Sequence, residues 1–212
     1  MAAPRTHTSN NAQASPLAST DAEHGSAAQR ERRRRILDAT LVLASKGGYD
    51  AVQMRTVAER ADVALATIYR YFTSKEHLYA AALLEWADNF PPREQSKRAG
   101  GRSDEAQLRA LMRRAVRAFE RYPQMMRVEI VIESSPDPNA RALFDQFAAR
   151  NVGALMTSLS STDPATAAII VETVNSVLAT RLRAWALGRI TIGDVDRSVQ
   201  KTLDLIFAAR AL

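Results

Sequence analysis

The sequence contains no cysteine, which excludes disulfide bonds and thiolate metal sites. Histidine is scarce, with His7, His24 and His77 as the three members, and neither a glycine-rich phosphate loop nor an HExxH zinc motif occurs. Glu129 and Glu133, one helical turn apart, are interpreted as a solvated face rather than a metal site. No apolar run reaches the roughly 18–20 residues of a membrane span, and no signal-peptide pattern opens the chain. These absences argue against an enzyme, a metal, a cofactor or a membrane partner, and they predict a cytoplasmic protein.

The composition is that of a soluble globular protein whose positive charge is unevenly placed. The 212 residues are 46% apolar and 25% charged, with a net charge of +6. Residues 29–75 hold ten Lys/Arg against five Asp/Glu, and residues 91–123 hold nine against four. A locally basic first third suits the binding of nucleic-acid phosphates, although a solvated basic face explains the charge equally well.

The chain reads as an all-α protein of about nine helices. Residues 1–28 are rich in small and polar residues and predict a disordered N-terminal arm. Apolar periodicity and breakers such as Gly47-Gly48 then predict helices at about residues 30–46, 54–61, 64–72, 75–90, 104–121, 124–134, 139–160, 163–187 and 192–211. We expect a three-helix unit at residues 29–75 and a larger helical domain at residues 76–212.

The second and third predicted helices have the spacing of a helix-turn-helix. Ala58 is the small residue that allows a close crossing, and Asp62 occupies the turn, where Asp tolerates left-handed backbone geometry. Val57, Val63 and Ile68 are the apolar residues expected to lock the second helix of the pair. A plain helical hairpin is the alternative. The helix-turn-helix interpretation predicts a helix presented to the major groove of DNA.

A set of short motifs with fixed spacing strengthens that interpretation. They are Ile36-Leu37-Asp38-Ala39, Lys46-Gly47-Gly48-Tyr49, Val57-Ala58, Ala61-Asp62-Val63, Thr67-Ile68-Tyr69-Arg70-Tyr71-Phe72 and Ser74-Lys75-Glu76-His77-Leu78. Together they closely resemble the DNA-binding domain of the TetR family of transcriptional repressors. Asp62 and Ala66 depart from the family pattern, because glycine is common at both positions.

The resemblance implies roles for individual residues in binding a double-stranded DNA operator. Arg55 is implied to reach a base edge, and residues 65–69 open the recognition helix. The residues implied to contact bases or phosphates are Gln53, Arg55, Thr56, Leu65, Ala66, Thr67, Tyr69, Tyr71 and Lys75, with Arg33 and Arg34 on the first helix. Three alternatives stay open. Tyr71 could instead pack on the first helix, and Arg55 could be a surface charge. The arginines of the first helix could be a solvated helix start.

In the TetR family the remaining helices bind a small effector and form a homodimer, and the apolar faces here permit both. The expected effector pocket consists of Leu111, Met112, Val116, Phe119, Met125, Met126, Ile130, Phe144, Phe147, Met156, Asn175 and Trp185. The expected dimer interface consists of Ile170, Val174, Val177, Leu182, Val199, Leu203 and Ile206. The alternative is that these side chains serve only the core of one subunit.

The expected function is repression at a palindromic operator, with release by a bulky apolar effector. The DNA-binding segment looks most like family members that repress cholesterol catabolism in actinobacteria, which implies a steroid or fatty acyl-CoA as effector. This closer similarity is expected to fade after about residue 85. Arg109, Arg113, Arg114 and Arg117 are candidates to neutralise a CoA phosphate at the pocket mouth. The alternatives are a drug- or metabolite-sensing regulator of efflux and a DNA-binding protein without a sensor.

Overall fold

The computed structural model describes residues 26–88 and 103–209, and within these ranges it contains nine helices and no strand. The helices are α2 (Ala27–Ala51), α3 (Met54–Ala61), α4 (Leu65–Tyr71), α5 (Lys75–Asp88), α6 (Asp104–Arg121), α7 (Pro123–Glu133), α8 (Pro138–Thr157), α9 (Pro164–Ala186) and α10 (Ile192–Ala209). The predicted all-α fold is confirmed. Residues 1–25 of the expected arm and the expected helix ends at 89–90 and 210–211 lie outside the described residues.

The first helix begins three residues earlier than expected and bends near its end. The Ser26 hydroxyl accepts a hydrogen bond from the Gln29 amide (3.3 Å), and the Gln29 side chain accepts one from the Ser26 amide (2.6 Å). This reciprocal cap starts α2 at Ala27, so Ala27 and Ala28 are helical rather than part of an arm. Gly47 and Gly48 leave helical geometry, with φ of 66° at Gly48, before a last turn ends the element. The predicted break therefore lies inside α2.

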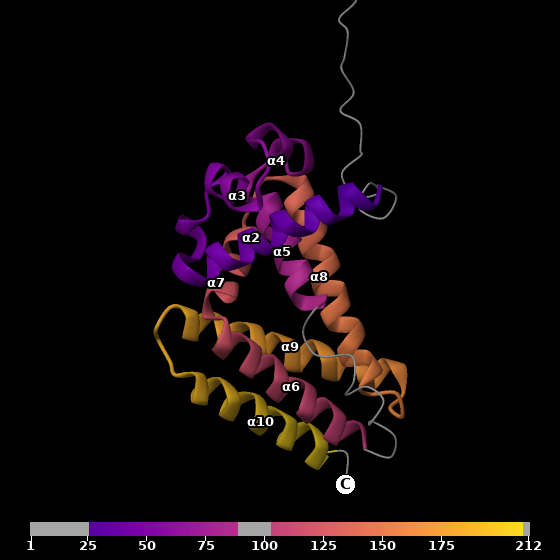
Figure 1. Ribbon diagram of the computed structural model, residues 1–212. Helices are drawn as coiled ribbons and strands as arrows, with labels where there is room; N and C mark the ends of the chain where they lie inside the picture. Colours follow the sequence, from indigo (N-terminus) through magenta and orange to yellow (C-terminus); the bar gives the residue numbers. More distant parts are fainter. Residues whose placement is uncertain (1–25, 89–102, 210–212) are drawn as a thin grey trace, which may run out of the picture.

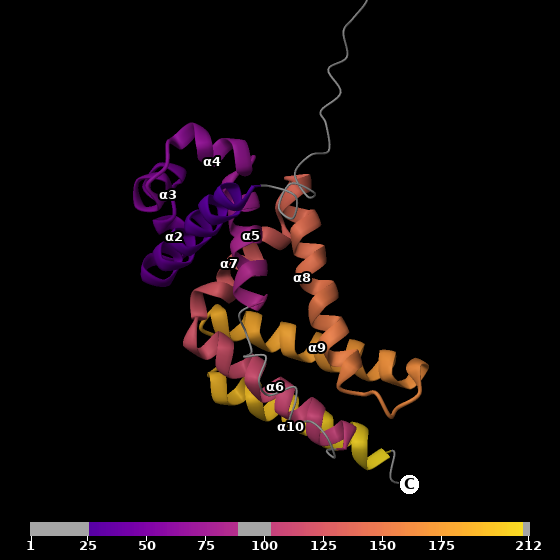
Figure 2. The ribbon, with the colours of Figure 1, turned by 45° about the vertical axis from the view of Figure 1, so that its right-hand side comes forward.

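The helices form two groups joined by α5, α7 and α8 (Figures 1 and 2). The N-terminal helices α2, α3 and α4 gather at one end, while α6, α9 and α10 lie side by side at the other. Helix α8 runs from the α4 end towards α9 and packs extensively along α5. Because α5 and α8 both reach from one group to the other, each can transmit a displacement between them.

Helix α9 has the length and apolar composition that a membrane span would need, but one of its faces packs inside the subunit. Its Ile170, Val174 and Leu182 are buried, and it packs against α7, α8 and α10. The buried face of α9 therefore gives no reason to expect a membrane.

The residues expected at a dimer interface lie mostly inside one subunit. Ile170, Val174, Leu182, Val199 and Leu203 are each at most 4% exposed and fill the space among α6, α7, α9 and α10. Val177 and Ile206 are half-buried beside the same core. The long apolar stripes of α9 and α10 therefore form the core of one subunit. The side chains that these helices leave outside include Ile169, which is 66% exposed, and Leu205, which is 75% exposed.

Candidate nucleic-acid interface and ligand cavity

The α3–α4 pair has the geometry of a helix-turn-helix. Asp62 ends α3 in the left-handed region (φ 53°, ψ 57°), and among the described residues no other non-glycine residue has a positive φ. The Val63 amide donates to the Ala58 carbonyl (3.0 Å), which closes the turn. Val57 and Ile68 are fully buried, and Ala58 is 3% exposed. The structure therefore confirms the turn, the small crossing residue and two members of the apolar lock.

Hydrogen bonds and ring contacts fix this unit to its neighbours. The Arg35 guanidinium donates to the Ala61 carbonyl at the end of α3 (3.0 Å). On the other side, the Tyr79 hydroxyl of α5 contacts the carbonyls of Gly48 (3.0 Å) and Tyr49 (3.1 Å). The Tyr49 and Tyr79 rings stack at 5.1 Å. These contacts attach the α3–α4 pair to α2, and α2 in turn to α5.

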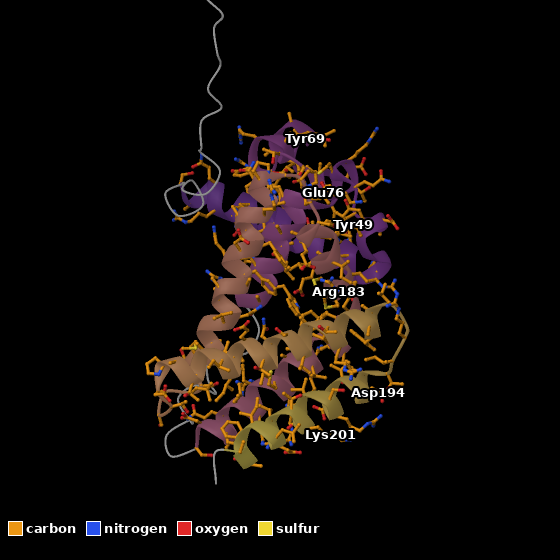
Figure 3. All side chains as sticks on the ribbon, turned by 180° about the vertical axis from the view of Figure 1, so that it is seen from behind. Tyr49, Tyr69, Glu76, Arg183, Asp194 and Lys201 are labelled. Carbon is orange, nitrogen blue, oxygen red and sulfur yellow. The ribbon has the colours of Figure 1, made fainter. Side chains whose placement is uncertain are left out.

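Most of the residues implied to contact DNA are exposed, on α3, on α4 or just before α3. Gln53, Arg55, Thr56, Leu65, Ala66 and Tyr69 are exposed, and Thr67 is half-buried. Tyr69 is 55% exposed and lies at the outer tip of the molecule, at the opposite end from Asp194 and Lys201 of α10 (Figure 3). Helix α4 carries no acidic residue. An exposed helix with an aromatic and a leucine but no acid is typical of a surface that meets a DNA groove.

Arg70 is an exposed residue of α4 that the sequence analysis did not assign to DNA. Its guanidinium lies 5.6 Å from the centroid of the neighbouring Tyr71 ring. Its exposure on the second helix of the pair makes it a further candidate for contact with DNA phosphates, and its place in the quoted motif was the signal that could have found it.

Two arginines of α2 are engaged within the protein. Arg33 is half-buried, with its guanidinium 6.0 Å from the centroid of the Phe72 ring. Burial lowers the pKa of Arg33, and the negative charge of Glu85 opposes that effect. Arg34 pairs with Glu31 (2.7 Å) and Asp38 (3.1 Å) along its own helix. Their contacts to DNA stay predictions.

Tyr71 and Lys75 also turn towards the protein. Tyr71 is half-buried, its hydroxyl oxygen is enclosed, and its ring lies 6.2 Å from that of Phe72. The Lys75 ammonium lies 3.8 Å from the centroid of the Tyr49 ring, and burial lowers its pKa. The alternative that Tyr71 serves packing thus agrees with its position. A phosphate contact by either residue requires a side-chain movement.

A polar cluster links the recognition unit to α8. Asp137 caps α8 by accepting hydrogen bonds from the amides of Asn139 (2.8 Å) and Ala140 (3.4 Å). Its other oxygen accepts from the hydroxyls of Thr73 (2.9 Å) and Ser74. Burial alone would raise the pKa of Asp137, but these hydrogen bonds hold it below its usual value. We call Thr73, Ser74 and Asp137 the α5–α8 clamp.

The clamp lies directly after the recognition helix. Thr73 and Ser74 follow the end of α4 at Tyr71. The Ser74 hydroxyl accepts a hydrogen bond from the His77 amide (3.0 Å), so Ser74 caps α5. The His77 ring is buried, and its Nδ1 atom lies 3.1 Å from the Thr73 hydroxyl. One carboxylate therefore joins the starts of α5 and α8 at the DNA-facing end.

An apolar cavity of about 140 Å³ lies among α5, α6, α8 and α9. Its lining consists of Trp86, Ala87, Leu111, Met112, Arg114, Ala115, Ala118, Phe119, Phe147, Asn151, Ala154, Leu155, Asn175 and Leu178. Among the predicted effector residues, the structure brings Leu111, Met112, Phe119, Phe147 and Asn175 to this wall. A cavity with mostly apolar walls and a few polar groups is the usual form of a small-molecule site.

The other predicted effector residues lie outside this lining. They are Val116, Met125, Met126, Ile130, Phe144, Met156 and Trp185. Met125 and Met126 are 2% exposed on α7, which packs against α2, α5 and α9. Their effector contacts stay predictions. Helical periodicity identifies an apolar face, but it does not say which neighbouring helix that face meets.

Trp86 is a cavity residue that the sequence analysis missed. It lies near the end of α5, and its ring is 5.5 Å from that of Phe119 and 6.2 Å from that of Tyr122. The signal that could have found it is its position on the helix that directly follows the DNA-binding unit. Through Trp86 the cavity wall belongs partly to the helix that carries the clamp.

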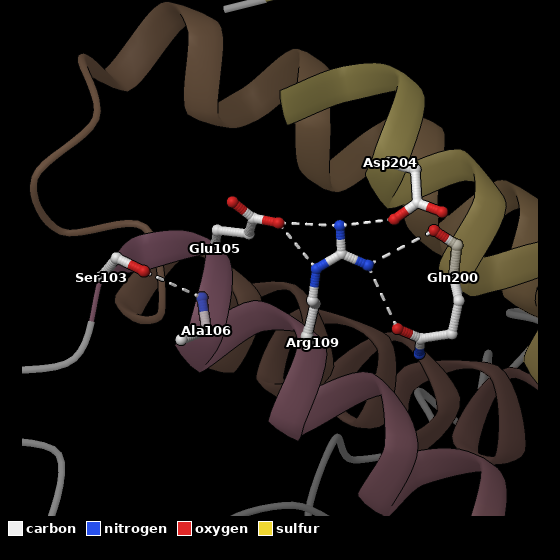
Figure 4. A network of polar contacts seen from close by, with 6 residues as sticks. All are labelled: Ser103, Glu105, Ala106, Arg109, Gln200 and Asp204. Carbon is white, nitrogen blue, oxygen red and sulfur yellow. Dashed lines mark hydrogen bonds and ion pairs between the residues drawn. The ribbon is translucent and has the colours of Figure 1, made fainter. Parts of the chain in front are cut away.

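The basic residues of α6 divide between two faces. Arg109 contacts α10, where it pairs with Asp204 (2.8 Å) and donates to the carbonyl (3.4 Å) and the side-chain oxygen (3.3 Å) of Gln200 (Figure 4). The carboxylate of Glu105, on the same helix, also pairs with the Arg109 guanidinium at 2.8 Å. Arg113 and Arg117 line an outer depression with α10. Of the four arginines proposed for the pocket mouth, Arg114 is the one that lines the cavity.

Glu129 differs from the solvated residue that was expected. Residue 129 as a whole keeps some exposure, but its carboxyl group is buried. That burial and the neighbouring charge of Glu133 raise the pKa of Glu129 to about 7, against an opposing effect of Arg183. Glu133 is exposed and pairs with Arg183 of α9. Within the described ranges, no three His, Cys, Asp or Glu residues are grouped to hold a metal ion.

Comparisons with known proteins agree with this architecture. Residues 36–82 match the family described as "Bacterial regulatory proteins, tetR family", and residues 101–206 match "Tetracyclin repressor-like, C-terminal domain". Two relatives are repressors named KstR. That of Rhodococcus jostii is 40% identical, covering 84% of each chain. That of Mycolicibacterium smegmatis is 37% identical, covering 88% of this chain and 92% of its own. The expectation that this similarity fades after residue 85 is therefore wrong.

The fold is shared with solved structures of lower identity. Thermus thermophilus FadR in complex with lauroyl-CoA superposes with a TM-score of 0.67 at 22% identity, covering 82% of this chain and 93% of that one. Bacillus subtilis FadR in complex with stearoyl-CoA gives 0.63 at 16% identity, covering 82% and 96%. The chain therefore belongs to the TetR family of transcriptional regulators, and within it is similar to the KstR repressors.

Proposed function

We propose that the protein is a cytoplasmic, dimeric repressor that binds a palindromic operator and is released by an apolar effector in the α5–α6–α8–α9 cavity. The observation that carries this proposal is the double attachment of α5 and α8. Each helix meets the recognition unit at its start, through Ser74 or Asp137, and lines the cavity further along, through Trp86 or Phe147. An effector that displaces the cavity wall therefore acts on the two helices that hold the recognition unit.

The size of the cavity supports release by displacement. About 140 Å³ is smaller than the roughly 300–1,000 Å³ of typical ligand pockets, so a bulky effector has to move lining side chains. Trp86 belongs to α5 and Phe147 to α8, so an effector that pushes against these side chains exerts a force on both helices. The effector favours the released state only as far as it binds that state more tightly than the DNA-bound state.

A dimer places two recognition helices on successive half-sites, about 34–36 Å apart. The outer face of α9 supports such a dimer, because most of its exposed residues between 164 and 180 are small or apolar, with Glu172 as the charged exception. Its exposed residues include Ala165, Ala168, Ile169, Thr173 and Ser176. Ile169→Glu should convert the dimer to a monomer and abolish operator binding, as measured by light scattering and fluorescence anisotropy. A dimer that persists in this variant would exclude α9 from the interface.

The relatives and the apolar wall favour a steroid or fatty acyl-CoA as effector. Two FadR proteins of the same fold were crystallised with acyl-CoA molecules, and the KstR repressors are similar over most of this chain. The cavity here is lined by side chains such as Leu111, Phe119 and Leu178, which suit an acyl chain or a ring system.

The deciding experiment titrates the protein against the DNA upstream of its own gene, with and without effector candidates. We expect specific binding that is lost in Tyr69→Ala and reversed by a steroid or fatty acyl-CoA. Release by antibiotics or dyes but not by acyl-CoA would favour a regulator of efflux. Binding that no metabolite reverses would favour a DNA-binding protein without a sensor. Absence of specific DNA binding by the wild type would refute the proposal.

A further inference from the structure

Helix α8 is a wall of the cavity with solvent behind it. It contributes Asn151 and Ala154 to the lining, and every residue from 148 to 154 is exposed. The other walls are held more firmly, because α6 and α9 pack against α10, and residues 77–83 of α5 are each at most 3% exposed. An effector that needs more room than the cavity offers therefore displaces α8 with the least loss of packing.

The start of α8 is tied to the residues that directly follow the recognition helix. One oxygen of Asp137 caps α8, and the other accepts hydrogen bonds from the hydroxyls of Thr73 (2.9 Å) and Ser74. In the first turn of α8, the side-chain amide of Asn139 donates to the Thr73 hydroxyl (3.2 Å). Two residues of α8 thus converge on Thr73.

Thr73 is attached to the recognition helix and to α5 as well. It lies two residues after Tyr71, the last residue of α4, and its amide donates to Nδ1 of His77 (3.2 Å). The His77 ring is buried and lies 5.4 Å from the ring of Phe72. The contacts of the Thr73 and Ser74 hydroxyls with Asp137 therefore span the junction between the recognition unit and α8.

These contacts can open at a small cost. Thr73 is exposed, and the clamp borders a surface depression that Glu76 and Asn139 also line, so water can replace each lost partner. A movement of roughly 1 Å takes a contact of 2.9 Å beyond hydrogen-bonding range. The clamp therefore has a closed and an open arrangement that differ by a few hydrogen bonds, as a ligand-driven population shift requires.

We propose that Asp137 is a positioning residue for the recognition helix, and that an effector releases the operator by displacing α8 and opening the α5–α8 clamp. Phe147 at the cavity and Asp137 at the clamp belong to one continuous helix, so a displacement at the first reaches the second. This inference rests on the proposed effector cavity and operator binding, and it adds the contact through which the two sites communicate.

The test measures how far a ligand releases the operator from full-length protein. Fluorescence anisotropy gives the affinity for the DNA upstream of the gene, without and with an excess of dodecanoyl-CoA, stearoyl-CoA or a steroid acyl-CoA. The quotient of these two affinities is the release ratio. Calorimetry verifies that each variant still binds the ligand, and circular dichroism with thermal melting verifies that it is folded.

Four variants separate the clamp from the rest of α8. Thr73→Val removes the hydroxyl but keeps the shape of the side chain, and Thr73→Ser keeps the hydroxyl. Asp137→Asn keeps an oxygen for the cap of α8 and replaces the oxygen that accepts from Thr73 and Ser74. Thr157→Val is the matched control, because it removes a hydroxyl that bonds to the Gly153 carbonyl at the far end of the same helix.

We expect a release ratio of about 5 to 150 for the wild type, the usual range for coupling between two sites. Thr73→Val and Asp137→Asn should each lower the ratio by about 3- to 10-fold or to near one, the effect of one hydrogen bond. The double variant should lower it no further than Asp137→Asn alone, because both changes act on one contact. Thr73→Ser and Thr157→Val should keep the wild-type ratio.

Two failures are distinguishable. If acyl-CoA releases the wild type, and Thr73→Val and Asp137→Asn keep the full ratio, the role of the clamp is refuted while the proposed function stands. An equal loss in Thr157→Val would also refute it, since the effect would not be specific to the clamp. If no ligand releases the wild type, the proposed effector class fails, and the inference fails with it. Should Thr73→Val not fold, Asp137→Asn decides by the same criterion.

Discussion

Replacement of Glu129 by glutamine should stabilise the protein, and the gain should depend on pH in a defined direction. The pKa of Glu129 is raised from 4.5 to about 7 by burial and by the charge of Glu133. Ionisation of this carboxyl is therefore more costly in the folded state than in the unfolded state. The contribution of Glu129 to the free energy of unfolding is fully present below about pH 4.5 and is lost as the pH rises through about 7. The two pKa values differ by about 2.5, and each pKa unit corresponds to about 1.36 kcal/mol, so the loss approaches about 3 kcal/mol.

Glutamine resembles the protonated carboxyl at every pH, so Glu129→Gln should be free of this loss. Urea unfolding at fixed protein concentration, at pH 5 and pH 8.5, gives the difference in free energy of unfolding between variant and wild type. We expect that difference to grow by about 2 kcal/mol between the two pH values. The exposed Glu120→Gln variant on α6 is the control, and its difference should stay constant. A constant difference for Glu129→Gln would refute the desolvation of this carboxyl.

Three further substitutions test the recognition surface, the clamp and the α6–α10 contact. Arg55→Ala should weaken operator binding by about 1–3 kcal/mol without changing the melting temperature, since the side chain is 83% exposed; unchanged anisotropy titrations would remove it from the interface. Asp137→Ala should destabilise the fold by about 2 kcal/mol by removing a cap and two interhelix hydrogen bonds, whereas Asp137→Asn keeps the cap and should cost less; equal melting curves would contradict this. Arg109→Leu should cost about 2 kcal/mol in urea unfolding, against about 0.5 kcal/mol or less for exposed Arg113→Leu; the reverse order would be contrary to the network in Figure 4.

Local sequence signals predicted the recognition unit well, because its geometry depends on neighbours in the chain. Asp62 takes the left-handed backbone expected of it, and α3 has the predicted limits. Ser74 caps α5 because a hydroxyl before a helix satisfies a free amide within the same turn. The turn and the cap each depend on residues a few positions apart in the chain, so the local sequence is enough to predict them.

Features that depend on distant neighbours were predicted less well. The guanidinium of Arg33 lies 6.0 Å from the centroid of the Phe72 ring, and Tyr71 is half-buried, because the fold brings α2 near the residue that follows α4. The division of the α6 arginines between the cavity and α10 likewise needed the position of α10. Val174 was expected at a dimer interface and is instead fully buried in the subunit. A periodic apolar face specifies that burial occurs but not against which partner.

The position of Asp137 at one end of α8 and of cavity residues further along restricts changes in the length of that helix. Each residue of an α-helix turns the chain by about 100° and advances it by about 1.5 Å. An insertion of one residue between Asp137 and Phe147 would turn Phe147 away from the cavity or pull Asp137 from Thr73 and Ser74. An insertion of about seven residues restores the angle but shifts the wall by about 10 Å. Regulators built on this plan can therefore change their ligand by exchanging side chains along α8, whereas insertions and deletions belong in the loops.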